Sequence, residues 1–292
     1  MVFEIKNDKL RITVKQTGAE LSSIQSVVTG KDFMWNGNPD VWGSTSPVLF
    51  PVIGAIKNGF VKYKGGEYAV PRHGFVRNND KVKLTEQTDN SLTFGLDSDE
   101  ALLKIYPFKF SFRITYRLDG DKIIVSHKIV NQGEDQMLFS LGAHPAFKCP
   151  LNEGEVYEDY YLEFEQIETD STWLLEDGGL VGSRTKPVLH NTNVLHLNGH
   201  LFDQDALIFK NLKSRQVSLR STKSGQVITV KFDDFPYLGI WAKPNAEFVC
   251  IEPWLGIADN VDSDQRFENK EGILRLAAGE TFEASYSIEI AE

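Results

Sequence analysis

Residues 111–118 read Ser-Phe-Arg-Ile-Thr-Tyr-Arg-Leu, and polar and apolar side chains alternate along the whole stretch. This period of two places the apolar residues on one face of a β-strand and the polar residues on the other. The same alternation returns at residues 10–15 and 282–290, close to the two ends of the chain. Each stretch therefore predicts a half-buried strand of an antiparallel sheet.

Turn sequences separate the predicted strands. Asp119-Gly120 follows the first stretch, and Ser224-Gly225 lies between β-rich runs at residues 216–220 and 227–232. Glycine tolerates the positive φ that a tight hairpin requires, so both pairs predict hairpin turns. Further turns are predicted at Asn36-Gly37, Gly65-Gly66 and Asn198-Gly199.

Helical patterns are short. Residues 98–106 predict one helix with Ser98 as its N-cap, and residues 263–271 predict another. The chain has 292 residues, 41% of them hydrophobic, which is enough for a large core. It contains no Pro/Ser-rich linker and no internal repeat. We therefore predict an all-β fold, a large antiparallel β-sandwich, with residues 1–292 forming a single domain.

Charge and composition exclude several classes of partner. The formal net charge is −10, and the most basic stretch, residues 104–117, is spread along a strand pattern, so we expect no nucleic-acid binding. The sequence has no signal peptide and no stretch of about 18 apolar residues, so we expect no membrane contact. Cys149 and Cys250 form no CxxC pattern and predict free thiols in a reducing cytoplasm. The sequence carries no signal for an oligomeric state.

Three segments carry candidate chemistry. The first, residues 71–78, reads Pro-Arg-His-Gly-Phe-Val-Arg-Asn and contains Arg72, His73 and Arg77. Arginine presents planar donors that suit vicinal hydroxyls, carboxylates or phosphates, and Gly74 lets backbone approach a ligand closely. The alternative is a solvated loop with an incidental histidine.

The second segment, residues 140–147, reads Ser-Leu-Gly-Ala-His-Pro-Ala-Phe. Apolar surroundings disfavour a charged His144, whereas a nearby carboxylate favours it, and this balance suits a proton-exchanging group. The alternative is a core histidine bonded to a backbone carbonyl.

The third segment, residues 250–256, reads Cys-Ile-Glu-Pro-Trp-Leu-Gly. Glu252 ends an apolar run and needs a partner if it is buried. Trp254 shares its face if the strand continues, and its indole can stack on a sugar ring. The alternative is a structural ion pair with Trp254 in the core.

These segments resemble, in their order, the aldose 1-epimerase (galactose mutarotase-like) family, in the divergent branch with an HGF-x-R segment. The matching motifs are HGFVR at 73–77, GAHPAF at 142–147, EPWLG at 252–256 and the early segment GAEL at 18–21. The resemblance spans nearly the whole chain. It implies a β-super-sandwich fold. It also implies an enzyme that opens and closes the ring of an aldose, here a hexose, without a cofactor and without a metal.

The resemblance also implies roles for individual residues. Glu252 falls on the general base, His144 on the general acid and His73 on an assisting histidine. The aspartate that holds sugar hydroxyls falls on Asp205 or, with a poorer match, Asp203. From their mutual charge we expect Glu252 to begin ionised with a depressed pKa and His144 to begin protonated with a raised pKa.

One segment departs from the family pattern. The better-known galactose mutarotases carry an arginine in a GR-I segment, where this chain reads Gly54-Ala55-Ile56 with Lys57 next. Arg72 or Arg77 can replace that arginine. The substrate is therefore predicted to be a small-molecule hexose or, through a cluster of Lys57, Arg72 and Arg77, a hexose phosphate.

Three other functions use some of the same residues. A glycoside hydrolase would pair Glu252 with Asp233 or Asp234, but this leaves both motif histidines unexplained. A non-catalytic sugar-binding or sugar-sensing protein can share the same fold. A metal enzyme with His73 and His144 as ligands lacks closely spaced histidine pairs, and the group at His190, His196 and His200 is typical of a surface loop.

Overall fold

A computed structural model describes residues 1–225 and 227–291. The first part of the chain contains β1 (Val2–Lys6), β2 (Leu10–Lys15), β3 (Glu20–Ser26), β4 (Val48–Leu49), β5 (Val61–Tyr63), β6 (Gly66–Tyr68), β7 (Lys83–Gln87), β8 (Ser91–Asp97), helix α1 (Glu100–Leu103), β9 (Phe110–Asp119), β10 (Lys122–Asn131), β11 (Met137–Phe139), β12 (Leu141–Ala143) and β13 (Ala146–Lys148). The second part contains β14 (Tyr160–Glu176), β15 (Leu180–His196), β16 (Leu207–Phe209), β17 (Gln216–Ser221), β18 (Val227–Lys231), β19 (Tyr237–Trp241), β20 (Phe248–Leu255), β21 (Leu274–Leu276) and β22 (Thr281–Ala291). Short 3₁₀ turns occur at Thr17–Ala19, Lys57–Gly59, Tyr157–Asp159, Asp177–Gly179 and Phe267–Asn269.

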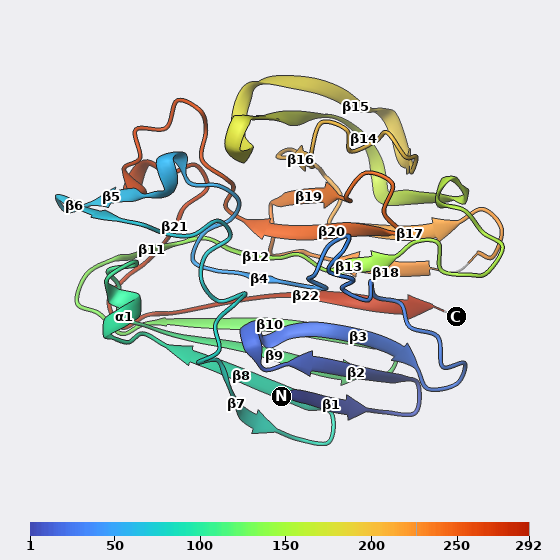
Figure 1. The fold of residues 1–292 in the computed structure, drawn as a ribbon, viewed down its shortest axis with the longest axis horizontal. Coiled ribbons are helices and arrows are strands. Elements are labelled where there is room, and N and C mark those ends of the chain that lie inside the picture. The colour runs from blue at the N-terminus through green and yellow to red at the C-terminus, as the bar shows by residue number, and fades with distance from the viewer. Residues whose placement is uncertain (226, 292) are drawn as a thin grey trace.

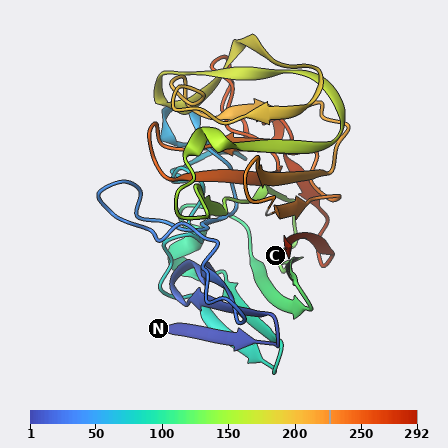
Figure 2. The same cartoon turned by 90° about the vertical axis from the view of Figure 1, so that its right-hand side faces the viewer.

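Two large antiparallel sheets form the body of the molecule (Figure 1). The nine-stranded sheet has the order β15-β14-β17-β18-β22-β10-β9-β8-β7, and the six-stranded sheet has the order β16-β19-β20-β12-β4 with β13 paired to β20. A three-stranded sheet, β1-β2-β3, lies at the opposite end of the molecule from the long β14–β15 hairpin (Figure 2). This arrangement confirms the predicted all-β antiparallel sandwich.

The alternating stretch that predicted the fold lies in β9. Phe112, Ile114 and Tyr116 are buried, while the residues between them point away from the core. The strand pairs with β10 through the register Asp119↔Lys122, so the turn between them has two residues. Gly120 has φ +62°, which is the left-handed conformation that the predicted hairpin requires.

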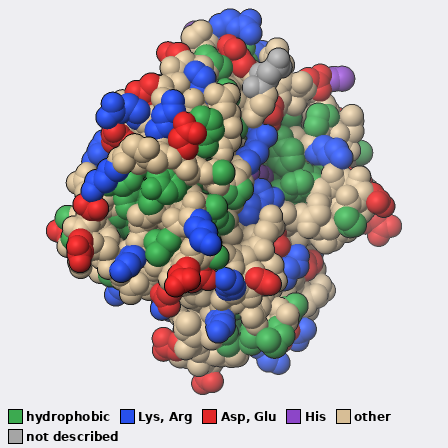
Figure 3. Space-filling model, turned by 60° about the vertical axis from the view of Figure 1, so that its left-hand side comes forward, with side chains coloured by type: hydrophobic (Ala, Val, Ile, Leu, Met, Phe, Trp, Pro, Cys, Tyr) green, Lys and Arg blue, Asp and Glu red, His purple; other side chains and the backbone are tan. Residues whose placement is uncertain are grey.

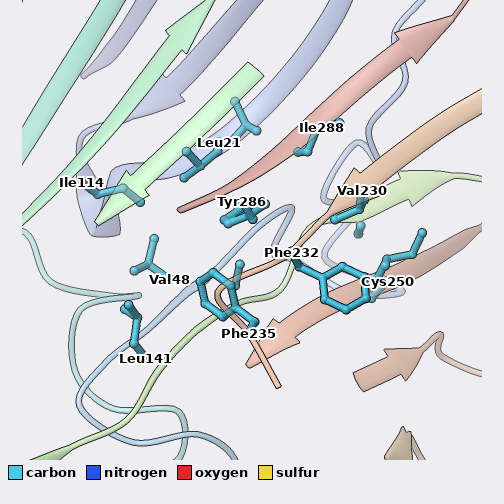
Figure 4. Packing of buried hydrophobic residues seen from close by; sticks show 14 of the residues in the cluster. Leu21, Val48, Ile114, Leu141, Val230, Phe232, Phe235, Cys250, Tyr286 and Ile288 are labelled. Carbon is cyan, nitrogen blue, oxygen red and sulfur yellow. The ribbon is translucent and has the colours of Figure 1, made fainter. Parts of the chain in front are cut away.

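A continuous hydrophobic cluster fills the space between the sheets. Leu21, Ile114, Phe235 and Tyr286 gather in it from distant parts of the chain (Figure 4). The cluster extends from Ile5 to Ile290. The single domain stays a prediction, and this shared core supports it.

The two predicted helices are shorter than expected. α1 spans only Glu100–Leu103, and its cap is Asp99, whose carboxylate accepts from the Leu102 N–H at 2.9 Å, because the Ser98 hydroxyl accepts from the Phe110 N–H instead. The expected helix at 263–271 reduces to the 3₁₀ turn, because Gln265 has φ +64° and its side chain donates to backbone carbonyls of the 57–60 segment. Among the residues described, no helix is long and apolar enough to cross a membrane.

Candidate active site

A cavity of about 290 Å³ opens beside the six-stranded sheet, and Figure 3 shows a hollow where basic and histidine side chains meet hydrophobic ones. β19 and β20 contribute Trp241, Glu252 and Trp254 to its lining, and the far end of the β14–β15 hairpin contributes Leu175 and Gly179. Most of the residues predicted from the sequence also line this cavity, namely His73, His144, Glu252, Arg72, Arg77, Asp205 and Trp254.

Glu252 and His144 face each other in this cavity. Glu252 lies on β20, and His144 follows β12, which pairs with β20 through Gly142↔Trp254. The His144 Nε2 atom lies 3.4 Å from the Glu252 Oε2 atom, and only 10% and 2% of the two side chains are exposed. The pair can therefore exchange a proton with a bound molecule while remaining nearly dry.

The expectation that Glu252 has a depressed pKa and His144 a raised pKa is wrong for this structure. Burial raises the pKa of Glu252 well above its usual range, opposed by the Trp254 indole N–H and by Arg77. Burial also lowers the pKa of His144 to about 3, and the nearby Arg77 guanidinium lowers it further. Dehydration outweighs the mutual attraction, and it favours the neutral form of both the carboxyl group and the imidazole.

His73 reaches the same cavity through a strained turn. Its φ is +63°, and the adjacent Gly74 has φ +75°. A Cβ atom on Gly74 would lie 1.9 Å from the Phe50 carbonyl oxygen, so only glycine fits there. The His73 Nδ1 atom accepts from the Gly54 N–H at 3.2 Å, which assigns the proton to Nε2, and burial keeps the pKa of His73 well below its usual range.

The two arginines add positive charge to the cavity. Arg72 is exposed and Arg77 is half-buried. Burial lowers the pKa of Arg77, while the Glu20 carboxylate opposes that shift. Among the side chains that the structure describes, neither guanidinium forms an ion pair with a carboxylate.

Lys57 does not join these arginines, contrary to the expected cluster. Its backbone N–H donates to the Asp259 carboxylate at 2.9 Å, and its ammonium donates to the Ser263 carbonyl at 2.9 Å. The side chain is therefore directed toward the 259–265 segment, and Lys57 does not line the cavity.

Of the two candidate aspartates, only Asp205 belongs to the cavity. Asp205 lines the cavity and has φ +73°, a conformation that aspartate tolerates better than most residues. Asp203 contacts the exposed His200 at 3.0 Å and does not line the cavity. His73 and Asp205 are thus two strained residues at one site, as is common where function constrains the backbone.

Glycines on two neighbouring strands make room for Trp254. A Cβ atom on Gly239 would lie 2.4 Å from the Trp254 Cζ2 atom, and one on Gly142 would lie 2.9 Å from its Cδ1 atom. The strand continues through Pro253 to Leu255, so Glu252 and Trp254 share one face as predicted. The indole is therefore part of the cavity floor.

Two further tryptophans were missed by the sequence analysis. Trp42 stacks on His144 with ring centroids 5.1 Å apart and planes at 27°, and Trp241 meets the same imidazole edge-on at 5.8 Å. Trp42 lies in the long loop before β4, and Trp241 ends β19. Neither belongs to a recognisable motif, so only the folded structure reveals their contact with His144.

The residues that the glycoside hydrolase and metal-enzyme alternatives require are not arranged in this structure for those functions. Asp233 and Asp234 do not line the cavity, and Asp234 instead accepts from the Ser285 N–H at 2.8 Å. Within the described chain, the one group with metal-ligand spacing is His144, Cys250 and Glu252, which leaves out His73. His190, His196 and His200 are exposed as expected, but His190 and His196 belong to β15, and only His200 lies in a loop.

The antiparallel sandwich, with a cavity beside its six-stranded sheet, has the fold of the galactose mutarotase-like proteins. More particularly, the family model for aldose 1-epimerase matches residues 1–272. The chain therefore belongs to the aldose 1-epimerase family, which confirms the resemblance found in the motifs.

Relatives agree over nearly the full length. The plasmid-encoded protein LacX of Lactococcus lactis subsp. lactis is 36% identical over 299 residues, covering 99% of each chain. The structure of a galactose mutarotase related enzyme from Lactobacillus acidophilus has a TM-score of 0.94 at 36% identity, covering 100% of this chain and 98% of that one. A galactose mutarotase-like protein from Lactobacillus casei has a TM-score of 0.93 at 26% identity, with 100% of both chains covered.

Proposed function

We propose that this protein is a mutarotase that interconverts the α and β anomers of a hexose or a hexose phosphate. The observation that carries the proposal is the buried Glu252–His144 pair, whose Oε2 and Nε2 atoms lie 3.4 Å apart at the wall of a cavity. Anomerisation requires one proton to leave the C1 hydroxyl and another to reach the ring oxygen. A carboxyl group and an imidazole can perform both transfers.

The protonation of the pair fits one end of this reaction. In ring opening, an ionised Glu252 accepts the C1 hydroxyl proton while a protonated His144 donates to the ring oxygen, and the C1–O5 bond breaks. Both residues are then neutral, and this is the state that burial favours in this structure. The neutral pair therefore corresponds to the open-chain aldose, and ring closure on either face restores the ionised pair.

The ionised pair needs support when the cyclic sugar binds. The Arg77 charge favours an ionised Glu252, and the Trp42 ring can favour a protonated His144. A cation over an indole face contributes about 0.5 to 2 kcal/mol, depending on desolvation. Hydrogen bonds from sugar hydroxyls to the carboxylate add to this effect.

Other lining residues orient the substrate in this proposal. Asp205 accepts from sugar hydroxyls, Trp254 packs against the ring, and neutral His73 donates from Nε2. Arg72 and Arg77 bind the phosphate of a hexose phosphate. Because both cysteines are free, we expect the reaction to occur in a reducing cytoplasm.

Polarimetry tests the proposal. Freshly dissolved α-D-glucose and α-D-galactose are followed with wild type and with Glu252→Gln, and NMR exchange follows glucose 6-phosphate. We expect catalysis in the wild type and a loss of about 10² to 10⁴ in rate for the variant. Glu247→Gln, an exposed glutamate next to the start of β20, is the matched control and should keep full activity.

Two outcomes contradict the proposal. Equal activity of Glu252→Gln and wild type would remove Glu252 from the mechanism. Sugar binding without acceleration on any of the three sugars would favour the alternative of a sugar-binding or sugar-sensing protein on the same fold.

A further inference from the structure

A third potential ligand lies beside the Glu252–His144 pair. Cys250 precedes Glu252 by two residues on β20, so both side chains emerge on the same face of the sheet. Their register partners on β19, Trp241 and Gly239, also belong to this face. One donor atom each from Cys250, His144 and Glu252 lies within 4.8 Å of the other two.

Two of these groups each have one buried polar atom without a hydrogen-bond partner. Within the described residues, these atoms are Oε2 of Glu252 and Nδ1 of His144. Glu252 is only 1% exposed, and Cys250 is fully buried. An orphaned carboxylate oxygen beside an imidazole and a thiol forms a sulfur, nitrogen and oxygen donor set, which is the set that Zn²⁺ prefers.

We propose that Cys250, His144 and Glu252 form a binding site for a thiophilic divalent cation, Zn²⁺ or its analogue Cd²⁺, and that occupancy inhibits the enzyme. His144 and Glu252 line the cavity, so a fourth coordination position faces the cavity and is open to water or to a sugar hydroxyl. Entry from the cavity therefore requires no opening of the sheet.

The charge balance of the bound state is favourable. Zn²⁺ displaces the proton of the thiol and the single proton of the Glu252–His144 pair, and two protons are released to solvent. The product contains one dication, one thiolate and one carboxylate, so the buried site is neutral before and after binding. Because ligands must lose protons, affinity rises with pH.

Inhibition follows from the identity of the ligands. A metal ion occupies the lone pairs through which Glu252 and His144 exchange protons with the sugar. This part of the inference rests on the proposed function, whereas metal binding itself does not. The binding experiment therefore stays decisive even if no mutarotation is found.

Binding is measured on the full chain by competition for Zn²⁺ with a chromophoric chelator, and by the ultraviolet thiolate-to-metal absorption of the Cd²⁺ complex. We expect one tight site, affinity that rises with pH, and Cd²⁺ absorption in the wild type. Cys250→Ala should lose the absorption and bind Zn²⁺ about tenfold or more weakly, at least the loss seen on removing an outer-shell partner of a metal. Cys149→Ala, the other buried thiol, and His200→Ala, an exposed histidine, are controls that should bind as the wild type does.

Circular dichroism verifies that each variant is folded. Equal Zn²⁺ affinity in folded Cys250→Ala and wild type would overturn the site, as would the absence of any tight binding. If the wild type catalyses mutarotation, stoichiometric Zn²⁺ should abolish it and a chelator should restore it. Tight binding through Cys250 with undiminished mutarotation would overturn the inhibitory role alone.

Discussion

Replacing Gly239 by alanine should displace the Trp254 indole and thereby disturb the catalytic carboxyl group. The new Cβ atom would lie 2.4 Å from the Trp254 Cζ2 atom, whereas ordinary contact begins at about 3.4 Å. The indole must therefore move by about 1 Å, and a misplacement of this size can cost about 10²-fold in rate. Overpacking of this kind also destabilises a fold by about 1 to 3 kcal/mol.

Two assays measure the two effects separately. Polarimetry gives kcat/KM on the preferred sugar, and urea unfolding gives the free energy of unfolding. Gly199→Ala is the matched control, because its Cβ atom would meet only the end of the Asn245 side chain, at 3.2 Å. We expect it to retain activity and most of its stability.

A second substitution examines the cause. Trp254→Phe in the Gly239→Ala background replaces the indole by a smaller ring and should recover part of the lost activity, a coupling that independent sites would not show. If Gly239→Ala keeps kcat/KM within about twofold of the wild type, a 1 Å displacement at this floor does not matter and the reasoning fails.

Three further results are expected. Burial lowers the pKa of His127 from 6.5 to about 4, so between these pH values only the unfolded chain takes up the proton. Relative to His127→Phe, the free energy of unfolding of the wild type should therefore fall by about 3 kcal/mol between pH 6.5 and pH 4. Parallel pH profiles of the two proteins would refute this. Arg72→Gln should lower activity on glucose 6-phosphate by about tenfold or more, the worth of one charge-assisted hydrogen bond, while sparing glucose; equal losses on both sugars would exclude a phosphate contact. Lys270→Met removes the ammonium that lies 2.6 Å from the buried Asp259 carboxylate and leaves that carboxylate without a cationic partner. The free energy of unfolding in urea should fall by about 3 to 5 kcal/mol, and a loss below about 1 kcal/mol, typical of a surface ion pair, would refute this.

The strands could be predicted from the sequence because a half-buried strand alternates apolar and polar residues with a period of two, as β9 and β22 do. It also brought six cavity-lining polar residues together through family motifs and one soft alignment, that of Asp205. The prediction for Lys57 was wrong because nearness in sequence to a motif does not decide where a side chain points. The Lys57 ammonium donates to the Ser263 carbonyl, away from the cavity.

The charges of the catalytic pair could not be read from the sequence. Two motifs far apart in the chain indicate attraction between Glu252 and His144, but they carry no measure of how completely water is removed. Dehydration comes from the packing of Trp42 and Trp241 around the imidazole, and neither residue belongs to a motif. The sign of each pKa shift is therefore a property of the assembled cavity.

The single proton held by the Glu252–His144 pair has a consequence for turnover. In the proposed reaction the proton crosses to the sugar and returns within one visit, whichever anomer departs. The catalyst is thus reset without drawing a proton from bulk water. A deeply dehydrated site, which would slow an enzyme that must reload from solvent between cycles, places no such limit on this one, and its turnover should not respond to the concentration of buffer.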